Sequence, residues 1–175
     1  MRFCCCAIAL CLCVPHAAAL PVPAFIPVQA SAAPEDASAA GAPVSAEAEQ
    51  KLRAFLDRFV DARKTPAEQA AMFAEPADYY EHGIVGREDI RRDVERYVRH
   101  WPYRHYTVSG IEYLSADPAS DRIFVSYMVE FEVARGSRHV RGTARYGAVI
   151  RDVDGAPKVE SIKEKVNSRR AGSND

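Results

Sequence analysis

The sequence predicts an α+β domain in which a curved antiparallel sheet wraps around a long helix. Apolar residues recur with the period of an amphipathic helix over residues 46–63 and 87–100. After Pro102 the apolar period changes to two, which is typical of strands with one buried face. The expected order of elements is helix, helix, short strand, helix and then four antiparallel strands.

Three helices are expected, over residues 46–63, 65–74 and 87–100. The first carries a single apolar stripe, formed by Leu52, Phe55, Leu56, Phe59 and Val60. The second begins with Thr65, Pro66 and Glu68, the pattern of a capping box with proline in the first turn. The third has arginines and acids interspersed on its polar face, which indicates a solvated surface rather than a binding patch.

A short strand is expected at residues 77–82, followed by long strands near 105–115, 123–133, 139–151 and 157–166. Breaks in the apolar alternation beside Gly110, and near Glu160 or Ser161, predict bulges.

The two central strands are expected to form a hairpin with its turn centred on Arg135 and Gly136. In that register Tyr127 faces Ala144 in the core, and Glu132 faces His139 on the outer side. Apolar and charged partners match on both faces at once, so the alternation predicts which face of each strand is buried.

The N-terminal residues predict export. Residues 1–19 have a basic start, an apolar run from Phe3 to Val14 and small residues up to Ala19, the layout of a cleaved secretory signal. The apolar run is about a dozen residues long, whereas a membrane span needs about 20. The mature chain is therefore expected to be periplasmic or secreted, without a membrane span. Residues 20–45 are expected to be a disordered linker, 46–167 the folded domain and 168–175 a disordered tail.

Composition narrows the chemistry of the mature domain. All five cysteines lie in the predicted signal, so no disulfide, thiolate metal site or cysteine nucleophile is expected after cleavage. A net charge of −1 argues against nucleic-acid binding. The later histidines show no metal-ligand spacing and there is no glycine-rich phosphate loop, so the sequence predicts no metal and no cofactor. Those histidines are His82, His100, His105 and His139.

Two stretches resemble the nuclear transport factor 2-like superfamily, also called SnoaL-like or cystatin-like. Residues 77–90 resemble its strand, its turn and the helix entry Gly86-Arg87-Glu88-Asp89-Ile90. Residues 93–106 resemble bacterial domains of this fold that are secreted alone or appended to larger proteins. The resemblance covers residues 46–167. The superfamily includes isomerases, dehydratases, cyclases, carriers and association modules, so the resemblance implies no single function.

The resemblance implies a cone-shaped half-barrel whose open end can hold a small apolar ligand. The residues expected to line it are Tyr80, His82, Trp101, Tyr127 and Tyr146. The alternative is that these are core aromatics whose polar groups are satisfied at the rim.

A catalytic alternative rests on the short strand. Asp78, Tyr80 and His82 are spaced by two, so they would share one face of that strand. His82 or Asp78 could then act as a general base while Tyr80 steadies an oxyanion, as in a small isomerase or dehydratase. The inner faces of the long strands are expected to contribute no acid or base. A non-catalytic module is therefore the expected function.

Association is the other function that the sequence leaves open. Members of the superfamily often dimerise through the outer face of the sheet. The residues expected on that face and in such an interface are Phe124, Met128, Glu130, Arg141 and Arg145. The partner would be a second copy of the chain or another exported protein.

Overall fold

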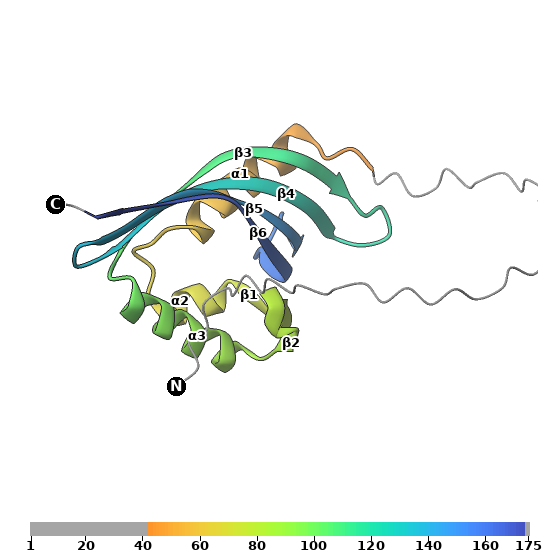
Figure 1. Cartoon of the computed structure of the whole chain (residues 1–175). Helices are drawn as coiled ribbons and strands as arrows, with labels where there is room; N and C mark the ends of the chain where they lie inside the picture. Colours follow the sequence, from red (N-terminus) through yellow and green to blue (C-terminus); the bar gives the residue numbers. More distant parts are fainter. Residues whose placement is uncertain (1–41, 174–175) are drawn as a thin grey trace, which may run out of the picture. The chain divides into compact units, whose positions relative to one another are not determined.

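A computed structural model describes residues 42–173; the predicted signal peptide, residues 1–19, and most of the predicted linker lie outside the described residues. The α+β class and the expected order are confirmed, with one additional two-residue strand (Figure 1). The elements are α1 (Ala46–Phe59), α2 (Pro66–Ala71), β1 (Phe73–Tyr79), the 3₁₀ turn η1 (Tyr80–His82), β2 (Ile84–Val85), α3 (Arg87–His100), β3 (Tyr103–Ala116), β4 (Arg122–Arg135), β5 (Arg138–Arg151) and β6 (Lys158–Ser173).

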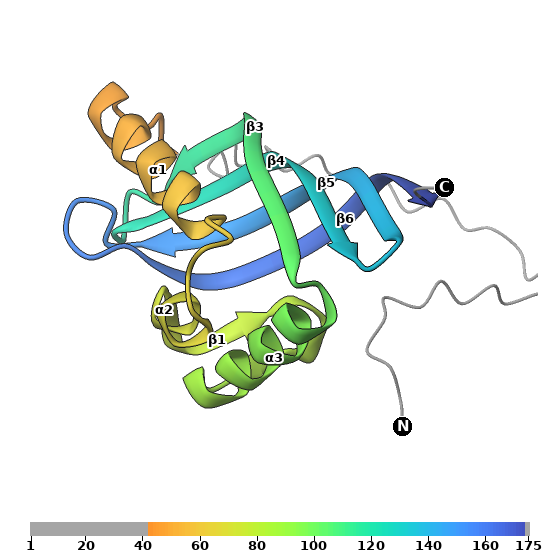
Figure 2. The same cartoon turned by 90° about the vertical axis from the view of Figure 1, so that its left-hand side faces the viewer.

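The strands form one curved sheet in the order β2-β1-β6-β5-β4-β3. Every neighbouring pair is antiparallel except β1 with β6, which run parallel. Figure 1 shows the sheet arching over α2 and α3, and Figure 2 shows α1 crossing the strands toward one end. Apolar residues of α1 pack against the inner face of the sheet in one core cluster with Ile123, Val125 and Ile150. The described helices include none that is long and apolar enough to cross a membrane.

The helix boundaries follow from their capping residues. The side chain of Thr65 accepts a hydrogen bond from the backbone of Glu68, and Glu68 returns one to Thr65, which confirms the predicted capping box. α2 is shorter than predicted and ends at Ala71, so Phe73 is buried as the first residue of β1. α3 occupies the predicted range, whereas α1 ends at Phe59, before the predicted end at residue 63.

The central hairpin keeps the predicted faces but not the predicted register. Gly136 adopts a positive φ of 57° and forms a two-residue turn with Ser137, so the turn lies one residue later than expected. Each cross-strand pairing consequently shifts by two residues. Tyr127 faces Tyr146 rather than Ala144. Glu132 lies opposite Arg141, but its carboxylate still contacts Nε2 of His139 at 2.7 Å, as predicted. A shift by two leaves the buried face unchanged because side chains alternate with that period.

Bulges interrupt the long strands where the sequence predicted them, beside Gly110 in β3 and at Glu160 in β6. The end of β6 corrects a second expectation. Residues 168–173, predicted as part of a disordered tail, continue the strand and pair with β5 as far as Ser173 opposite Arg138. β5 is therefore paired along its whole length with β6 as well as with β4.

Candidate functional site

Three rows of side chains cross the concave face of the sheet between β3 and β6. Partners on adjacent strands point to the same face, so the pairing register defines each row. The first row is Ile111, Tyr127, Tyr146 and Glu164; the second is Val108, Val129, Ala144 and Val166; the third is Tyr106, Phe131, Gly142 and Arg169. Polar and charged groups therefore lie at the β6 end of an otherwise apolar and aromatic surface.

Aromatic rings of four tyrosines form a continuous chain at the first row. Tyr127 and Tyr146 are stacked with ring centroids 5.5 Å apart, and Tyr80 meets the ring of Tyr146 edge-on at 6.5 Å. Tyr79 contacts Tyr80 at 4.6 Å. The Tyr146 hydroxyl donates a hydrogen bond to Oε1 of Glu164 at 2.8 Å. This tyrosine cluster thus ends in a carboxylate on the concave face.

The hydroxyls of the cluster differ in whether they have a hydrogen-bond partner within the protein. Tyr79 donates to Oδ2 of Asp93 at 3.1 Å. The hydroxyl of Tyr127 makes no hydrogen bond within residues 42–173, although its side chain is only 1 % exposed. No fully buried polar side-chain atom of the described residues lacks a partner, so this oxygen retains contact with solvent. Tyr127 therefore presents a nearly buried donor to the solvent side of the cone.

Burial keeps these phenols protonated. It raises the pKa of Tyr80 and of Tyr146 well above the usual value of a phenol, and the neighbouring carboxylate of Glu164 acts in the same direction. Burial also raises the pKa of Tyr127, again with Glu164 contributing. The cluster therefore combines neutral hydrogen-bond donors with one carboxylate, an arrangement that suits a ligand carrying both an acceptor and a donor.

The cone is open between β6 and α3. β1 pairs with β6 only as far as Tyr79 opposite Ile162, because Tyr80 then enters η1 with a positive φ of 47°. From Lys163 onward β6 is paired on the β5 side alone (Figure 2). Val166 lies on the concave face yet is 44 % exposed, and Tyr97 of α3 is 43 % exposed. Solvent therefore reaches the concave face along this side.

Comparison with known proteins identifies the fold. No family model and no curated protein matches the sequence, whereas solved structures match over most of the chain. A hexachlorocyclohexane dehydrochlorinase, LinA-type3 from Novosphingobium barchaimii, is 16% identical with a TM-score of 0.56, covering 74% of this chain and 90% of its own. A Nostoc punctiforme protein of unknown function with a cystatin-like fold is 14% identical with a TM-score of 0.56, covering 71% and 94%. The chain has the nuclear transport factor 2-like fold.

A third similar structure was solved with a small molecule. It is a Catenulispora acidiphila protein in complex with S-DNPA, 16% identical with a TM-score of 0.57, covering 69% of this chain and 95% of its own. At such identities the likeness of these proteins concerns the fold alone. The chemistry of this nuclear transport factor 2-like domain has to be argued from its own residues.

The predicted catalytic set Asp78, Tyr80 and His82 is not brought together. The strand ends at Tyr79 and η1 breaks the alternation that would have aligned the three side chains. Asp78 lies on the outer face, where it accepts hydrogen bonds from Ser161 at 3.1 Å and Lys163 at 2.9 Å. His82 is exposed and stacks on Tyr79. Of the three, only Tyr80 joins the tyrosine cluster.

The other predicted ligand-binding residues divide between two places. Tyr127 and Tyr146 lie in the cluster with Tyr80, as described above. Trp101 instead packs with Val133 and Val140 in a second core cluster, against which Tyr106 and Phe131 of the third row also pack. The guanidinium of Arg138 lies 5.1 Å from the Trp101 ring centroid.

Glu164 is the functional candidate that sequence reasoning missed. The bulge at Glu160 shifts the phase of β6, so the apolar residues of the strand do not alternate continuously along the sequence. Ile162, Glu164 and Val166 are nevertheless spaced by two, and their shared face could have been inferred from that spacing alone.

The five residues predicted for an interface all lie on the outer face of the sheet, and Phe124 is 41 % exposed there. Their pairing differs from expectation, because Glu130 lies opposite Thr143 while Arg141 and Arg145 form ion pairs with Glu132 and Glu112. Whether this face is an interface stays a prediction.

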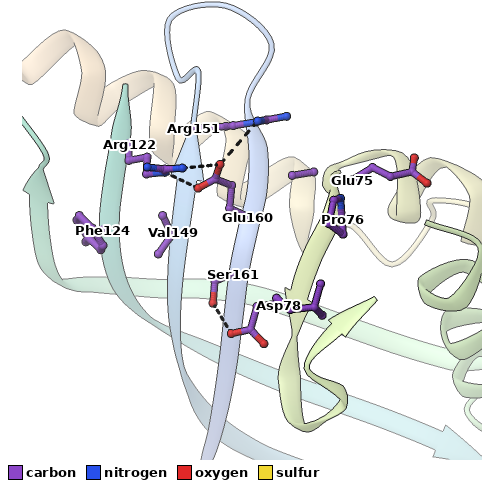
Figure 3. Close-up of a pocket in the computed structure, with 11 residues that line it drawn as sticks. Glu75, Pro76, Asp78, Arg122, Phe124, Val149, Arg151, Glu160 and Ser161 are labelled. Atoms are coloured by element: carbon purple, nitrogen blue, oxygen red, sulfur yellow. Dashed lines mark hydrogen bonds and ion pairs between the residues drawn. The ribbon is translucent and has the colours of Figure 1, made fainter. Parts of the chain in front are cut away.

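An open depression of about 500 Å³ lies on the outer face beside Phe124 and Val149 (Figure 3). At its edge Glu160 forms ion pairs with both Arg122 and Arg151. A second depression, of about 520 Å³, shares these three charged residues. Both depressions lie away from the tyrosine cluster, and the Glu160 carboxylate offsets part of the charge of the two arginines. Among residues 42–173 no group of His, Cys, Asp and Glu is arranged to hold a metal ion.

Proposed function

We propose that this domain binds a small, largely apolar molecule on the concave face of its sheet, with the hydroxyl of Tyr127 as the central hydrogen-bond donor. The observation that carries the proposal is that this hydroxyl belongs to a side chain only 1 % exposed and has no partner within the described residues. A nearly buried donor is costly unless something accepts from it. A ligand acceptor would satisfy it in a place that water reaches only narrowly.

The surroundings of Tyr127 supply the rest of such a site. Val166, in the adjacent row, provides apolar surface because it is 44 % exposed. Glu164 engages one carboxylate oxygen with Tyr146, which leaves the other oxygen to accept from a hydroxyl or amide of the ligand. Because the tyrosine rings contact one another, entry requires one ring to move, and Tyr80 lies in the short turn at the open side.

The test is calorimetric titration of the full chain with a neutral aromatic amide, 2-naphthamide, together with native mass spectrometry of protein purified from its natural source. Tyr127→Phe removes only the hydroxyl, and affinity for the amide should fall by about tenfold. Tyr113→Phe is the matched control, because Tyr113 is exposed on the outer face. Equal affinity in the wild type and Tyr127→Phe would contradict the proposal.

Proton-transfer catalysis is the second candidate, favoured by Glu164. A carboxylate beside neutral phenols can remove a proton from carbon while a hydroxyl stabilises the resulting oxyanion. The test is exchange of the methyl protons of 2-acetylnaphthalene into heavy water, followed by NMR. Glu164→Gln should abolish exchange while binding persists, and Glu130→Gln on the outer face should leave it unchanged. Absence of protein-dependent exchange would leave binding alone as the function.

Association through the outer face is a separate proposal, supported by exposed Phe124 beside an open depression. Sedimentation velocity should then show a dimer that Phe124→Ser dissociates. A monomeric wild type at all concentrations would oppose self-association.

Export is likewise proposed, on the basis of residues 1–19, which lie outside the described residues. N-terminal sequencing of the protein recovered from the periplasm or medium should begin at Leu20. An intact Met1 would contradict cleavage.

A further inference from the structure

We infer that the molecule bound in the cone is an aromatic or otherwise apolar carboxylic acid, whose carboxylate is held by Arg169 at the open side. This inference rests on the proposed binding function and adds the charge of the ligand to it.

Arg169 occupies the β6 end of the third row, opposite Gly142 of β5. Gly142 has no side chain, so the next group on that row is the aromatic ring of Phe131, which lies close beside the glycine. Arg169 forms no ion pair within residues 42–173. An arginine without an acid therefore lies on the concave face, next to an aromatic surface.

A second cation on the concave face, Arg104, also has no acidic partner among the described residues. The guanidinium of Arg104 donates to the carbonyl oxygens of Trp101 at 2.8 Å and Ala62 at 2.9 Å. These bonds hold the guanidinium in place but leave its positive charge uncompensated by any described carboxylate. Arg104 lies on the concave face of β3, and β4 and β5 separate it from the strand of Arg169.

Two phenols complete the arrangement. The hydroxyl of Tyr106 donates to that of Tyr97 at 3.0 Å, which leaves the Tyr97 proton available to a ligand oxygen. Burial raises the pKa of Tyr97 and the carboxylate of Glu164 adds to the rise, whereas the hydrogen bond from Tyr106 and the charges of Arg104 and Arg169 act against it. A phenol proton thus lies beside the third row, which ends in Arg169.

The charges along β6 orient such a ligand. Glu164 lies in the first row and Arg169 in the third, with Val166 between them. A carboxylate is attracted to the third row and repelled from the first. The apolar body of the ligand would then lie over Val166, and an uncharged acceptor would approach Tyr127.

The experiment compares 2-naphthoate with its neutral analogue 2-naphthamide by calorimetric titration of the full chain at low ionic strength, where charge effects are least screened. The wild type should bind the acid about tenfold more tightly than the amide. Arg169→Gln should remove this preference without changing affinity for the amide, and Arg169→Lys should retain part of it.

Arg170→Gln is the matched control. Arg170 is the next residue of the same strand but faces outward, opposite Arg141, so both affinities should stay at their wild-type values. Equal loss of acid binding in Arg169→Gln and Arg170→Gln would overturn the inference, because general surface charge would then explain the preference. Wild-type binding of the amide without preference for the acid overturns this inference alone. Failure of both probes to bind overturns it together with the proposed function.

Discussion

The ring of Phe131 occupies the space beside Gly142, where a β-carbon on residue 142 would come within 2.6 Å of the ring carbon Cζ. Such a β-carbon would also overlap the carbonyl oxygen of Ser168 in β6. We expect Gly142→Ala to lower the free energy of unfolding by about 2 kcal/mol, because overpacking displaces a ring and a backbone segment. Gly147→Ala in the same strand meets nothing within 4 Å and should not destabilise the domain. Urea denaturation of both variants tests this difference. Equal stabilities of the two variants would contradict the prediction.

The hydroxyls of Tyr79 and Tyr127 should differ in their effect on stability. Tyr79→Phe removes the hydrogen bond to Asp93 and should lower the free energy of unfolding by about 1 kcal/mol. Tyr127→Phe removes a hydroxyl without a described partner and should change that free energy by less than about 0.5 kcal/mol. A large loss in Tyr127→Phe, measured by the same denaturation, would show that this hydroxyl has a structural role.

Alkaline pH should destabilise the domain. Burial raises the pKa of six of the eight tyrosines, namely Tyr79, Tyr80, Tyr97, Tyr106, Tyr127 and Tyr146. Below about pH 10 these phenols are protonated in both the folded and the unfolded chain. Above it the unfolded chain releases protons that the folded chain retains, so the free energy of unfolding falls as pH rises.

Two measurements follow the tyrosines at high pH. The urea midpoint should stay constant up to about pH 9.5 and then decline, while absorbance at 295 nm shows most phenols ionising only as the domain unfolds. Ionisation of all eight near pH 10 without loss of structure would contradict the burial of the cluster.

Deletion of residues 168–175 tests the strand that replaces the predicted tail. The deleted residues pair with β5 from Arg138 to Thr143. Val140, within that stretch, packs on Trp101. We expect a loss of about 1–2 kcal/mol in unfolding free energy from the missing cross-strand pairs. Trp101 is the only tryptophan of the chain, so its fluorescence should shift to longer wavelength. A disordered tail could be deleted without either change.

The sequence predicted those parts of the fold that depend on residues close together in the chain. The range of α3 followed from Gly86 and Pro102 at its two ends, and the buried faces of the hairpin followed from alternation alone. The register was missed by two residues because alternation is equally satisfied by either pairing, and only the positive φ of Gly136 decides between them.

The candidate site was less predictable because it depends on interruptions of regular structure. Tyr80 reaches the cluster from η1, whereas a regular strand would have aligned it with Asp78. Glu164 reaches the concave face through the phase change at Glu160. Arg169 was assigned to a tail, so its position opposite Gly142 had no counterpart in the sequence pattern. Each of these positions depends on a turn or bulge, or on the pairing of β6 with β5, which local alternation does not determine.

The early departure of β1 from β6 has a consequence for behaviour in concentrated solution. Beyond Ile162 the backbone of β6 has an unpaired edge, and such an edge can recruit a strand from another molecule. That stretch carries Lys163, Lys165, Arg169 and Arg170 against a single acid, Glu164. Two copies approaching edge to edge would bring like charges together, which opposes aggregation through this strand. The basic side chains thus allow the domain to keep one side of its sheet open to small molecules while discouraging other chains from extending it.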